Sequence, residues 1–434
     1  MKRILFLLAA LAAALPIPVP AQNMFRGDPA HTGIYHADGP RELKGVKWAF
    51  QTGGPILTSP AIVNSVAFIG SDDHYLYAVD TATGTAKWKF ETAGPIRSSP
   101  AVVAGIVYFA SYDGWFYAVD AACGKLKWKF ATPGEKRFEA KGLHGFWPRS
   151  QTIPDFWDTW QSSPVVVNGF VYFGSGDGNL YALDAATGQL KWEFETDGVV
   201  HSSPAVFDGL VYFGSWDSYF YALDAVTGAQ RWKFKTGEDK HNFNQVGIQA
   251  SAAIADGVVY FGCRDAHLYA LEAKSGKQKW TFDNHGTWIN ASATVHRGTV
   301  YVGASIPANF FALDAATGKP RYTLDMQFPV FSSAAIAEDT AYFGSDNGKL
   351  HALNLKTGKM AWEFQTESSK RNALGVIAAD GAMNFKVIFR TNFFEEMYRD
   401  GEKLYSLGSI LSSPTVDNGA VYFGSTNGNL YALD

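Results

Sequence analysis

Cysteine is scarce in this chain of 434 residues, which contains only Cys123 and Cys263. The repeat described below places the two residues in turns at opposite ends of their strands, so we expect no disulfide bond between them. Neither residue belongs to a recognised metal-ligand motif. The sequence therefore predicts neither a disulfide scaffold nor a cysteine-based metal site.

The chain also lacks an excess of positive charge and a long hydrophobic run. Lys and Arg number 37 against 41 Asp and Glu, and the net charge of −4 makes nucleic acid an unexpected partner. The apolar run 4–15, which follows Lys2 and Arg3, is shorter than the roughly 20 residues of a transmembrane helix. It is typical of a secretory signal peptide. We expect residues 1–21 to be removed by cleavage after Ala21, leaving a periplasmic or secreted protein without a transmembrane segment.

One repeated unit of about 40 residues dominates the rest of the sequence. Residues 202–234 show it clearly, since Ser-Ser-Pro, Val-Tyr-Phe-Gly-Ser, Tyr-Ala-Leu-Asp and Thr-Gly before a Trp follow one another there. Short runs rich in Val, Tyr and Phe between Gly or Asp residues indicate β-strands. Pairs such as Asp208-Gly209 and Asp177-Gly178 favour tight hairpins. Each unit is therefore predicted to form four antiparallel strands, named A to D in chain order.

The two ends of the sequence complete each other. Trp48 has the context of a D strand with no A to C strands before it, and the sequence stops at Asp434 directly after a C strand. Pairing these ends would leave no open sheet edge. We therefore predict an all-β, eight-bladed β-propeller of four-stranded antiparallel blades over residues 46–434, preceded by an N-terminal segment, 22–45. The C strands are marked by Tyr77, Tyr117, Tyr181, Tyr221, Tyr269, Phe311, His351 and Tyr431.

The residues that return in every unit are expected to be structural. Asp can bond turn amides, Gly can adopt a positive φ, and Trp can pack between blades. Truncating one of these tryptophans, for example Trp232→Ala, is predicted to cost about 3–5 kcal/mol if the side chain is fully buried. Function is therefore sought where the repeat is interrupted.

Three insertions interrupt the repeat, at about 133–160, 236–247 and 367–410, and all lie between a D strand and the next A strand. They should therefore lie on one face. The third could instead be a degenerate ninth blade, and residues 392–404 within it could form a helix. Aromatic residues in such loops either pin the loop down or roof a pocket over the axis. The candidate side chains of this loop face are Lys141, His144, Trp147, Arg149, Trp157, Trp160, His241, Asn242, His285, Lys370 and Arg371.

The residue before the pair that opens each A strand, which is Ser-Ser in five of the eight blades, varies from blade to blade. In order these residues are Leu57, Arg97, Gln161, His201, Gln249, Asn290, Phe331 and Leu411. A purely structural ring would repeat one residue type, so the variation predicts a ligand-shaped funnel, provided that this position faces the axis. The predicted binding residues are Arg97, Gln161, His201, Gln249 and Asn290, together with Trp216 and Arg264 from B-to-C turns of the same face. No catalytic or metal-binding residue is assigned.

The unit resembles the pyrroloquinoline quinone (PQQ) propeller repeat over essentially residues 46–434. That family includes PQQ-dependent dehydrogenases and non-catalytic propellers of the BamB type, and the segment from Phe25 to Gly33 resembles the non-catalytic group. Resemblance to the dehydrogenases implies a quinone on the axis held by Arg, Lys and Asn, a Ca²⁺ ion with Glu, Asn and Asp ligands, a catalytic Asp and often a disulfide between adjacent Cys. This chain has no adjacent Cys pair, and its polar ring contains no carboxylate.

We therefore expect a non-catalytic binding or assembly scaffold, monomeric, whose loop-rich face binds an envelope protein or an extracellular polymer. The alternative is a PQQ-dependent dehydrogenase of alcohols or sugars with PQQ and Ca²⁺ as cofactors, for which Arg97, His201 and Asn290 are suited. A third interpretation is a polysaccharide lyase or hydrolase that uses His144, His201 and Arg97.

Overall fold

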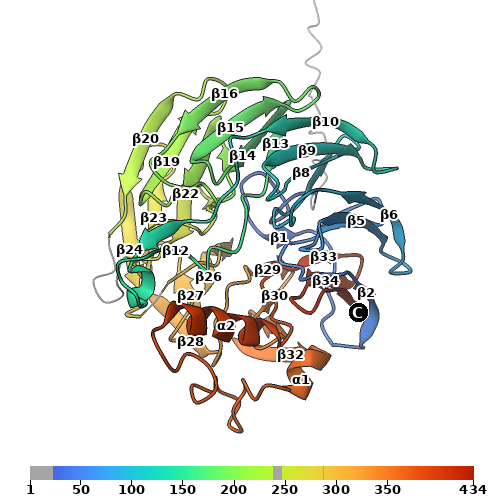
Figure 1. Cartoon of the computed structure of the whole chain (residues 1–434), viewed down its shortest axis with the longest axis vertical. Helices are drawn as coiled ribbons and strands as arrows, with labels where there is room; N and C mark the ends of the chain where they lie inside the picture. Colours follow the sequence, from blue (N-terminus) through green and yellow to red (C-terminus); the bar gives the residue numbers. More distant parts are fainter. Residues whose placement is uncertain (1–22, 238–246, 287) are drawn as a thin grey trace, which may run out of the picture.

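Each copy of the repeat folds into a four-stranded antiparallel sheet, and eight such blades surround a central axis (Figure 1). The computed structural model describes residues 23–237, 247–286 and 288–434, and the blade count refers to these. In the fourth blade, β17 (Ala205–Phe207), β18 (Leu210–Gly214), β19 (Tyr219–Asp224) and β20 (Gln230–Lys235) pair in chain order. The predicted fold class is confirmed.

The first three blades consist of β3 (Ala61–Val63), β4 (Val66–Gly70), β5 (Tyr75–Asp80) and β6 (Ala86–Glu91), then β7 (Ala101–Val103), β8 (Ile106–Ala110), β9 (Trp115–Asp120) and β10 (Leu126–Ala131), then β13 (Val165–Val167), β14 (Phe170–Gly174), β15 (Asn179–Asp184) and β16 (Leu190–Glu195). Blades five to seven consist of β21 (Ala253–Ala255), β22 (Val258–Gly262), β23 (His267–Glu272) and β24 (Gln278–Asp283), then β25 (Thr294–His296), β26 (Thr299–Gly303), β27 (Asn309–Asp314) and β28 (Pro320–Asp325), then β29 (Ala335–Ala337), β30 (Thr340–Gly344), β31 (Lys349–Asn354) and β32 (Lys359–Gln365).

The eighth blade is built from both ends of the propeller. It contains β33 (Thr415–Asp417), β34 (Ala420–Gly424) and β35 (Asn429–Leu433), and β2 (Val46–Gln51) completes it by pairing antiparallel with β35. A series of hydrogen bonds also joins neighbouring blades near the axis, because the backbone N–H of the Ser at this A-strand position generally donates to the hydroxyl oxygen of the equivalent Ser in the next blade. The backbone N–H of Ser163, for example, donates to the Ser203 hydroxyl oxygen at 2.9 Å, and that of Ser203 to Ser251 at 2.9 Å.

The repeated Asp, Gly and Trp residues form the contacts between blades. Nε1 of Trp192 donates to the Ala225 carbonyl oxygen of the next blade at 3.1 Å. Gly228 lies under the same indole with φ of +72°, and a Cβ there would be 2.7 Å from Trp192 Cδ2. Asp224 closes the turn by accepting from the backbone N–H of Thr227 at 2.9 Å. These residues are therefore structural.

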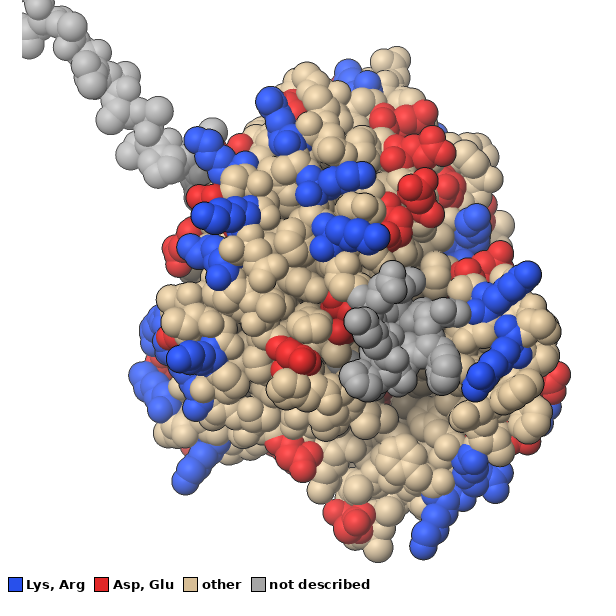
Figure 2. All heavy atoms as spheres, turned by 90° about the vertical axis from the view of Figure 1, so that its left-hand side faces the viewer, with Lys and Arg blue, Asp and Glu red and all other residues tan. Residues whose placement is uncertain are grey.

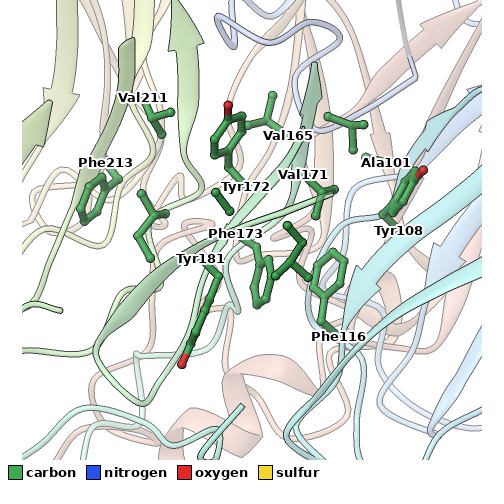
Figure 3. Packing of buried hydrophobic residues seen from close by; sticks show 14 of the residues in the cluster. Ala101, Tyr108, Phe116, Val165, Val171, Tyr172, Phe173, Tyr181, Val211 and Phe213 are labelled. Atoms are coloured by element: carbon green, nitrogen blue, oxygen red, sulfur yellow. The ribbon is translucent and has the colours of Figure 1, made fainter. Parts of the chain in front are cut away.

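Aromatic side chains fill the space between neighbouring blades. Figure 3 shows this core between the second, third and fourth blades, where Phe116 and Phe173 stack with ring centroids 4.0 Å apart. The Tyr172 ring lies in the same cluster and its hydroxyl donates to the Ala225 carbonyl oxygen at 2.9 Å. Blade-to-blade packing of this kind explains why Val, Tyr and Phe recur at the same strand positions.

Replacing Trp232 with alanine is expected to lower the free energy of unfolding by about 2 kcal/mol, below the 3–5 kcal/mol of a fully buried aromatic residue. The indole is only half-buried, and its Nε1 donates to the Ala273 carbonyl oxygen at 3.0 Å. Trp232→Phe, which keeps a ring but removes the donor, should cost about 1 kcal/mol. Urea denaturation measures the loss of unfolding free energy in both variants. If Trp232→Phe lost as much as Trp232→Ala, the hydrogen bond and not the packing of the ring would be the main contribution.

The N-terminal segment crosses the face opposite the first and third insertions. The carbonyl oxygens of Pro29 and Ala30 accept from the inner-strand N–H groups of Val206 and Ile254. The buried Arg26 guanidinium donates to the Ala293 carbonyl oxygen at 2.6 Å, and β1 (Ile34–Tyr35) adds to the seventh blade parallel to β29. This segment therefore closes one end of the axial channel.

The third insertion contains helices where a ninth blade would need strands. Between β32 and β33 lie α1 (Glu367–Arg371) and α2 (Phe394–Tyr405). The ninth-blade alternative is therefore wrong, and the helix considered for residues 392–404 is observed as α2. The pair Asp400-Gly401 suggested a hairpin turn, but both residues lie within α2. Gly401 packs there against Phe156, where a Cβ would not fit.

Some predictions concern residues that the structure does not describe. The signal peptide, 1–21, and the candidates His241 and Asn242 lie outside the described residues. In the part of the chain that is described, no helix combines the length and apolar character needed to cross a membrane.

Candidate functional site

The first and third insertions fold against each other over one end of the propeller axis, and we call residues 133–160 and 367–410 the roof. The strands β11 (Glu139–Lys141) and β12 (Thr152–Pro154) form a hairpin around a 3₁₀ turn, Leu143–Gly145 (Figure 1). The backbone of Trp147 bridges to Phe393 just before α2, with Trp147 N donating to the Asn392 carbonyl oxygen at 2.7 Å. The roof is therefore one packed unit.

The variable ring position faces the axis. Gln161, His201, Gln249, Asn290, Phe331 and Leu411 line an axial cavity together with the inner Ser residues. The apolar members of the ring, Leu57, Phe331 and Leu411, pack with the roof residues Trp157, Trp160 and Tyr405. The cavity that remains has a volume of only about 40 Å³. The roof therefore fills most of the predicted funnel.

The carboxylate of Asp158, from the first insertion, lies at the centre of the polar half of the ring. His201 Nδ1 is 2.7 Å from Asp158 Oδ1, and His201 Nε2 is 2.8 Å from Glu135 Oε1. Gln249 Nε2 donates to Asp158 Oδ1 at 3.3 Å, and Phe138 N donates to Oδ2 at 2.7 Å. Two ring side chains therefore bind the roof directly.

His201 is held as an imidazolium between these two carboxylates. The residue is only 2% exposed, and burial alone would lower its pKa. The charges and hydrogen bonds of Asp158 and Glu135 outweigh burial and raise the pKa of His201 from 6.5 to about 10. At neutral pH the imidazolium and the two carboxylates thus form a buried ion cluster between the fourth blade and the roof.

Asp155 forms a second buried ion pair, with Arg264 of the fifth blade. Arg264 Nη1 donates to Asp155 Oδ2, and Nη2 donates to Gln249 Oε1 at 2.9 Å. His144 Nε2 is 3.1 Å from Asp155 Oδ1. Burial acts to raise the pKa of Asp155, but Arg264 and His144 hold it below its ordinary value.

Two indole rings enclose the Arg264 guanidinium. Its central carbon lies 4.3 Å from the Trp216 ring centroid and 4.2 Å from that of Trp288, and the side chain is 1% exposed. Phe138 of the first insertion stacks on the other side of Trp216, with centroids 4.3 Å apart. Cation–π contact and the pairing with Asp155 together satisfy a charge that burial would otherwise penalise.

The Arg97 side chain binds both Asp72 of the first blade and Thr159 of the roof, and its backbone binds the ring residue Gln161. Its guanidinium forms a bidentate pair with Asp72 at 2.8 and 2.7 Å. Burial acts to lower the pKa of Arg97, and Asp72 more than offsets this, so the pKa is raised. Nη1 also reaches the Thr159 carbonyl oxygen at 3.4 Å, and Arg97 N donates to Gln161 Oε1 at 3.1 Å.

Several residues of this network were missed by sequence analysis. Asp72, Tyr112 and Asp346 follow the Ser that ends strand B, the same position as Trp216 and Arg264, and variation at that position could have identified them. Asp346 is fully buried, its carboxylate has no hydrogen-bond partner among the described residues, and burial raises its pKa well above the ordinary value. Asp155 and Asp158 occur in a loop without a repeat to compare, so no sequence signal distinguished them.

The predicted residues of the loop face are dispersed. His144 belongs to the Asp155 cluster, whereas Lys141 lies on β11 and the Arg149 guanidinium lies 5.2 Å from the half-exposed Trp147 ring. His285 pairs with Asp283 at 3.1 Å, Lys370 pairs with Glu367 at 2.7 Å on α1, and Arg371 ends α1. The structure therefore brings His144 to the buried network and Trp157 and Trp160 to the apolar side of the ring, and it leaves the other described candidates near the surface.

The residues at the axis do not fit PQQ with Ca²⁺. Pockets for ligands of this size measure roughly 300–1,000 Å³, whereas the axial cavity measures about 40 Å³. The carboxylates of Asp155 and Asp158 face Arg264 and His201, not an open space. In the described ranges no group of three or more His, Cys, Asp or Glu residues is placed to hold a metal ion. A cofactor could enter the ring only if residues 155–160 left it, so the binding funnel stays a prediction.

The comparisons with known proteins give one family profile and relatives of two kinds, BamB proteins and quinoprotein dehydrogenases. The family profile described as outer membrane protein assembly factor BamB matches residues 38–143, 146–282 and 264–434. The BamB protein of Yersinia pestis is 27% identical over 167 residues, which are 35% of this chain and 42% of that protein. The quinoprotein ethanol dehydrogenase of Pseudomonas aeruginosa is 38% identical over 82 residues, 17% of this chain and 13% of that enzyme. The aligned regions thus span less than half the length of these curated relatives.

A solved structure supports the same fold. BamB from Moraxella catarrhalis superposes with a TM-score of 0.64 over 90% of this chain and 99% of its own, at 14% identity. At this identity the likeness establishes the propeller fold and nothing further. The predicted resemblance to PQQ-like propellers of the BamB type is confirmed by the family profile and by the Yersinia pestis relative.

Proposed function

The chain belongs to the family of the outer membrane protein assembly factor BamB, and on this premise we propose that it is a non-catalytic binding scaffold that serves envelope assembly. The observation that carries the proposal is the occupation of the ring by the chain's own roof. Asp158 binds His201 and Gln249, and Asp155 binds Arg264. The polar side chains that a dehydrogenase would direct at a cofactor are engaged in holding the roof.

The outer surface of the roof supports a protein partner. Trp147 and Phe393 are 52% and 58% exposed and adjacent through their backbone bridge, and Phe385 of the same roof is 54% exposed. Exposed aromatic side chains gathered on one surface are typical of protein interaction sites, and Trp is frequent among energetically dominant interface residues. We therefore propose the roof as the binding face for an envelope protein.

The charge distribution is consistent with this partner. On the side of the molecule shown in Figure 2, Lys and Arg are interspersed with Asp and Glu, without one continuous surface of a single sign. This side offers no footprint for nucleic acid, in keeping with the net charge of −4. The proposal therefore retains a protein partner of the envelope and no nucleic acid.

We further propose that residues 1–21 are a signal peptide and that the protein acts, as a monomer, in the periplasm or outside the cell. Support comes from the apolar run 4–15 after Lys2 and Arg3. Determining the N-terminal sequence of the protein from a periplasmic fraction tests this. A first residue of Gln22 is expected; an intact Met1 would contradict export by cleavage.

Site-specific photo-crosslinking in cells of the source organism tests the scaffold proposal. A photoreactive residue at position 149, beside Trp147 on the roof, should give a crosslinked product of defined mass. The same residue at position 191, on the outer strand β16 away from the roof, is the matched control and should give none. No product from the roof position, or equal products from both, would contradict the proposal.

The double substitution of Trp147 and Phe393 by alanine should reduce the crosslinked product from position 149 at least tenfold, because truncating an aromatic residue that dominates an interface costs about 2 kcal/mol or more. Both side chains are more than half exposed, so the thermal unfolding temperature should change little. Phe207→Ala, an exposed apolar residue on β17 at the opposite face, is the control and should leave the product unchanged.

The dehydrogenase alternative is tested on the purified protein. Addition of PQQ and Ca²⁺ is expected to give neither a bound quinone absorbance nor dye-linked oxidation of ethanol or glucose. Turnover that depends on both additions would contradict the scaffold proposal and would require the 155–160 loop to vacate the ring.

A further inference from the structure

A second cavity lies inside the roof, separate from the residual axial cavity. Its volume is about 250 Å³, it is partly open to solvent beside the exposed Phe385 and Ile306, and it is lined by side chains of both roof insertions and of the fifth-to-seventh blades. Its principal apolar walls are Trp157, Trp288, Phe331, Met383, Phe389 and Met397. The residues Asp155 and Asp158, whose ion pairs hold the roof, are not among the residues that line this cavity. The cavity is therefore not part of the contacts that fasten the roof.

The lining favours an uncharged ligand. Among the described lining residues there is no Asp, Glu, Lys or Arg, and the imidazole of His144 is already bound to Asp155 at 3.1 Å. A charged ligand would lose its hydration without gaining a counter-charge. Aromatic rings at several inclinations surround the space, since Trp157 meets Trp288 at 66° and Phe389 at 57°. Such walls suit an aromatic molecule.

One wall residue provides an unused hydrogen-bond donor. Trp288 is 6% exposed, and its Nε1 has no hydrogen-bond partner among the described residues. A buried indole N–H normally has an acceptor, and leaving it without one is unfavourable. The ring position is well defined, because one face contacts the Arg264 guanidinium at 4.2 Å. A ligand that carries an acceptor atom would satisfy this donor.

We propose that the roof cavity binds a small uncharged aromatic molecule that carries one hydrogen-bond acceptor, such as an aryl ketone or aldehyde, with Trp288 Nε1 as the donor. The volume of about 250 Å³ lies just below the usual range for drug-sized ligands, so the cavity suits one aromatic ring with a short substituent. This ligand site is additional to the proposed protein-binding surface of the roof and does not depend on it.

Two ligands of matched shape test the donor. Acetophenone carries a carbonyl oxygen, and α-methylstyrene has a CH₂ group in its place. Titration calorimetry or ligand-observed NMR with the full-length mature protein should show acetophenone binding at least tenfold more tightly. Trp288→Phe retains a ring beside Arg264 and removes the N–H group, so it should reduce the preference to about onefold while α-methylstyrene binding persists.

A cavity-filling variant tests the location. Met397→Trp should weaken binding of both ligands more than tenfold, and Met383→Trp serves if Met397→Trp loses its native circular dichroism. Absence of acetophenone binding, a preference that survives Trp288→Phe, or binding unaffected by both filling variants would each overturn the proposal. A negative crosslinking result at position 149 would leave these measurements unchanged, so failure of the proposed function and failure of the ligand site are distinguishable.

Discussion

Arg264→Met should lower the free energy required to open the roof by about 3–5 kcal/mol, because it leaves the buried Asp155 carboxylate without its cation. Methionine approximates the length of the arginine stem and can stay between Trp216 and Trp288, so the loss reports mainly the charge. Hydrogen exchange of the Asp155 amide, which donates to the Phe138 carbonyl oxygen at 2.7 Å, measures roof opening. Its exchange rate should rise by roughly 10²–10³-fold or more.

A second substitution provides the control for Arg264→Met. Asp155→Asn in the same background removes the uncompensated charge and keeps a carbonyl oxygen for the Trp157 amide, which donates to Asp155 Oδ1 at 2.8 Å. Part of the lost protection should therefore return in the double variant. If the loss of opening free energy in the double variant equals the sum of the losses in the two single variants, the two side chains act independently. The ion pair would then not hold the roof.

Roof stability should fall by about 2–3 kcal/mol between pH 7 and pH 9, because in this range the closed roof keeps the His201 proton while the open state has lost it. Its pKa is about 10 in the folded protein and 6.5 ordinarily, so the folded state binds the proton more tightly. The contribution is therefore complete below pH 6.5 and is lost as the pH rises toward 10. Tryptic cleavage after Arg137 in the roof, normalised to a free peptide of the same sequence, measures the opening at each pH.

Glu135→Gln is the matched test of the pH dependence. It removes one of the two carboxylates that contact His201 while Asp158 remains at 2.7 Å, so the folded pKa of His201 should fall and cleavage should accelerate at a lower pH. His201→Gln, which cannot gain a proton, should show an opening free energy that varies little from pH 7 to 9. A wild-type protein with the same flat profile would show that His201 does not contribute through its charge.

These predictions share one physical basis, which is that the roof is bound by buried charges from three separate parts of the chain. Glu135, Asp155 and Asp158 come from the first insertion, whereas His201 and Arg264 come from the fourth and fifth blades. Buried ion pairs specify one arrangement because each unpaired charge is costly. The exposed side chains of Trp147 and Phe393 on the outer side of the roof are thereby held in a defined position.

The strands, the blade order and the closure of the ring could be read from the repeat. The contact between Gly228 and Trp192, for example, recurs from blade to blade, because a turn residue with positive φ lies under an indole ring. A contact that is repeated in this way produces a repeated pattern in the sequence. The variation at the ring position also drew attention to His201 and Gln249, which line the axial cavity, although the sequence left open whether this position faces the axis. Their partners could not be read, because Asp155 and Asp158 lie in an insertion that has no second copy.

The amino-acid sequence by itself determined the propeller, since local strand patterns, tight turns and a recurring inter-blade contact are encoded within each unit of about 40 residues. Only the tertiary structure decided what fills the axis. Whether Arg264 and His201 face a ligand or a neighbouring loop depends on contacts such as Arg264 with Asp155, which are 109 residues apart, and no local pattern records such a distance. The roof that results fills most of the funnel, and its own surface and cavity are the binding places that we propose.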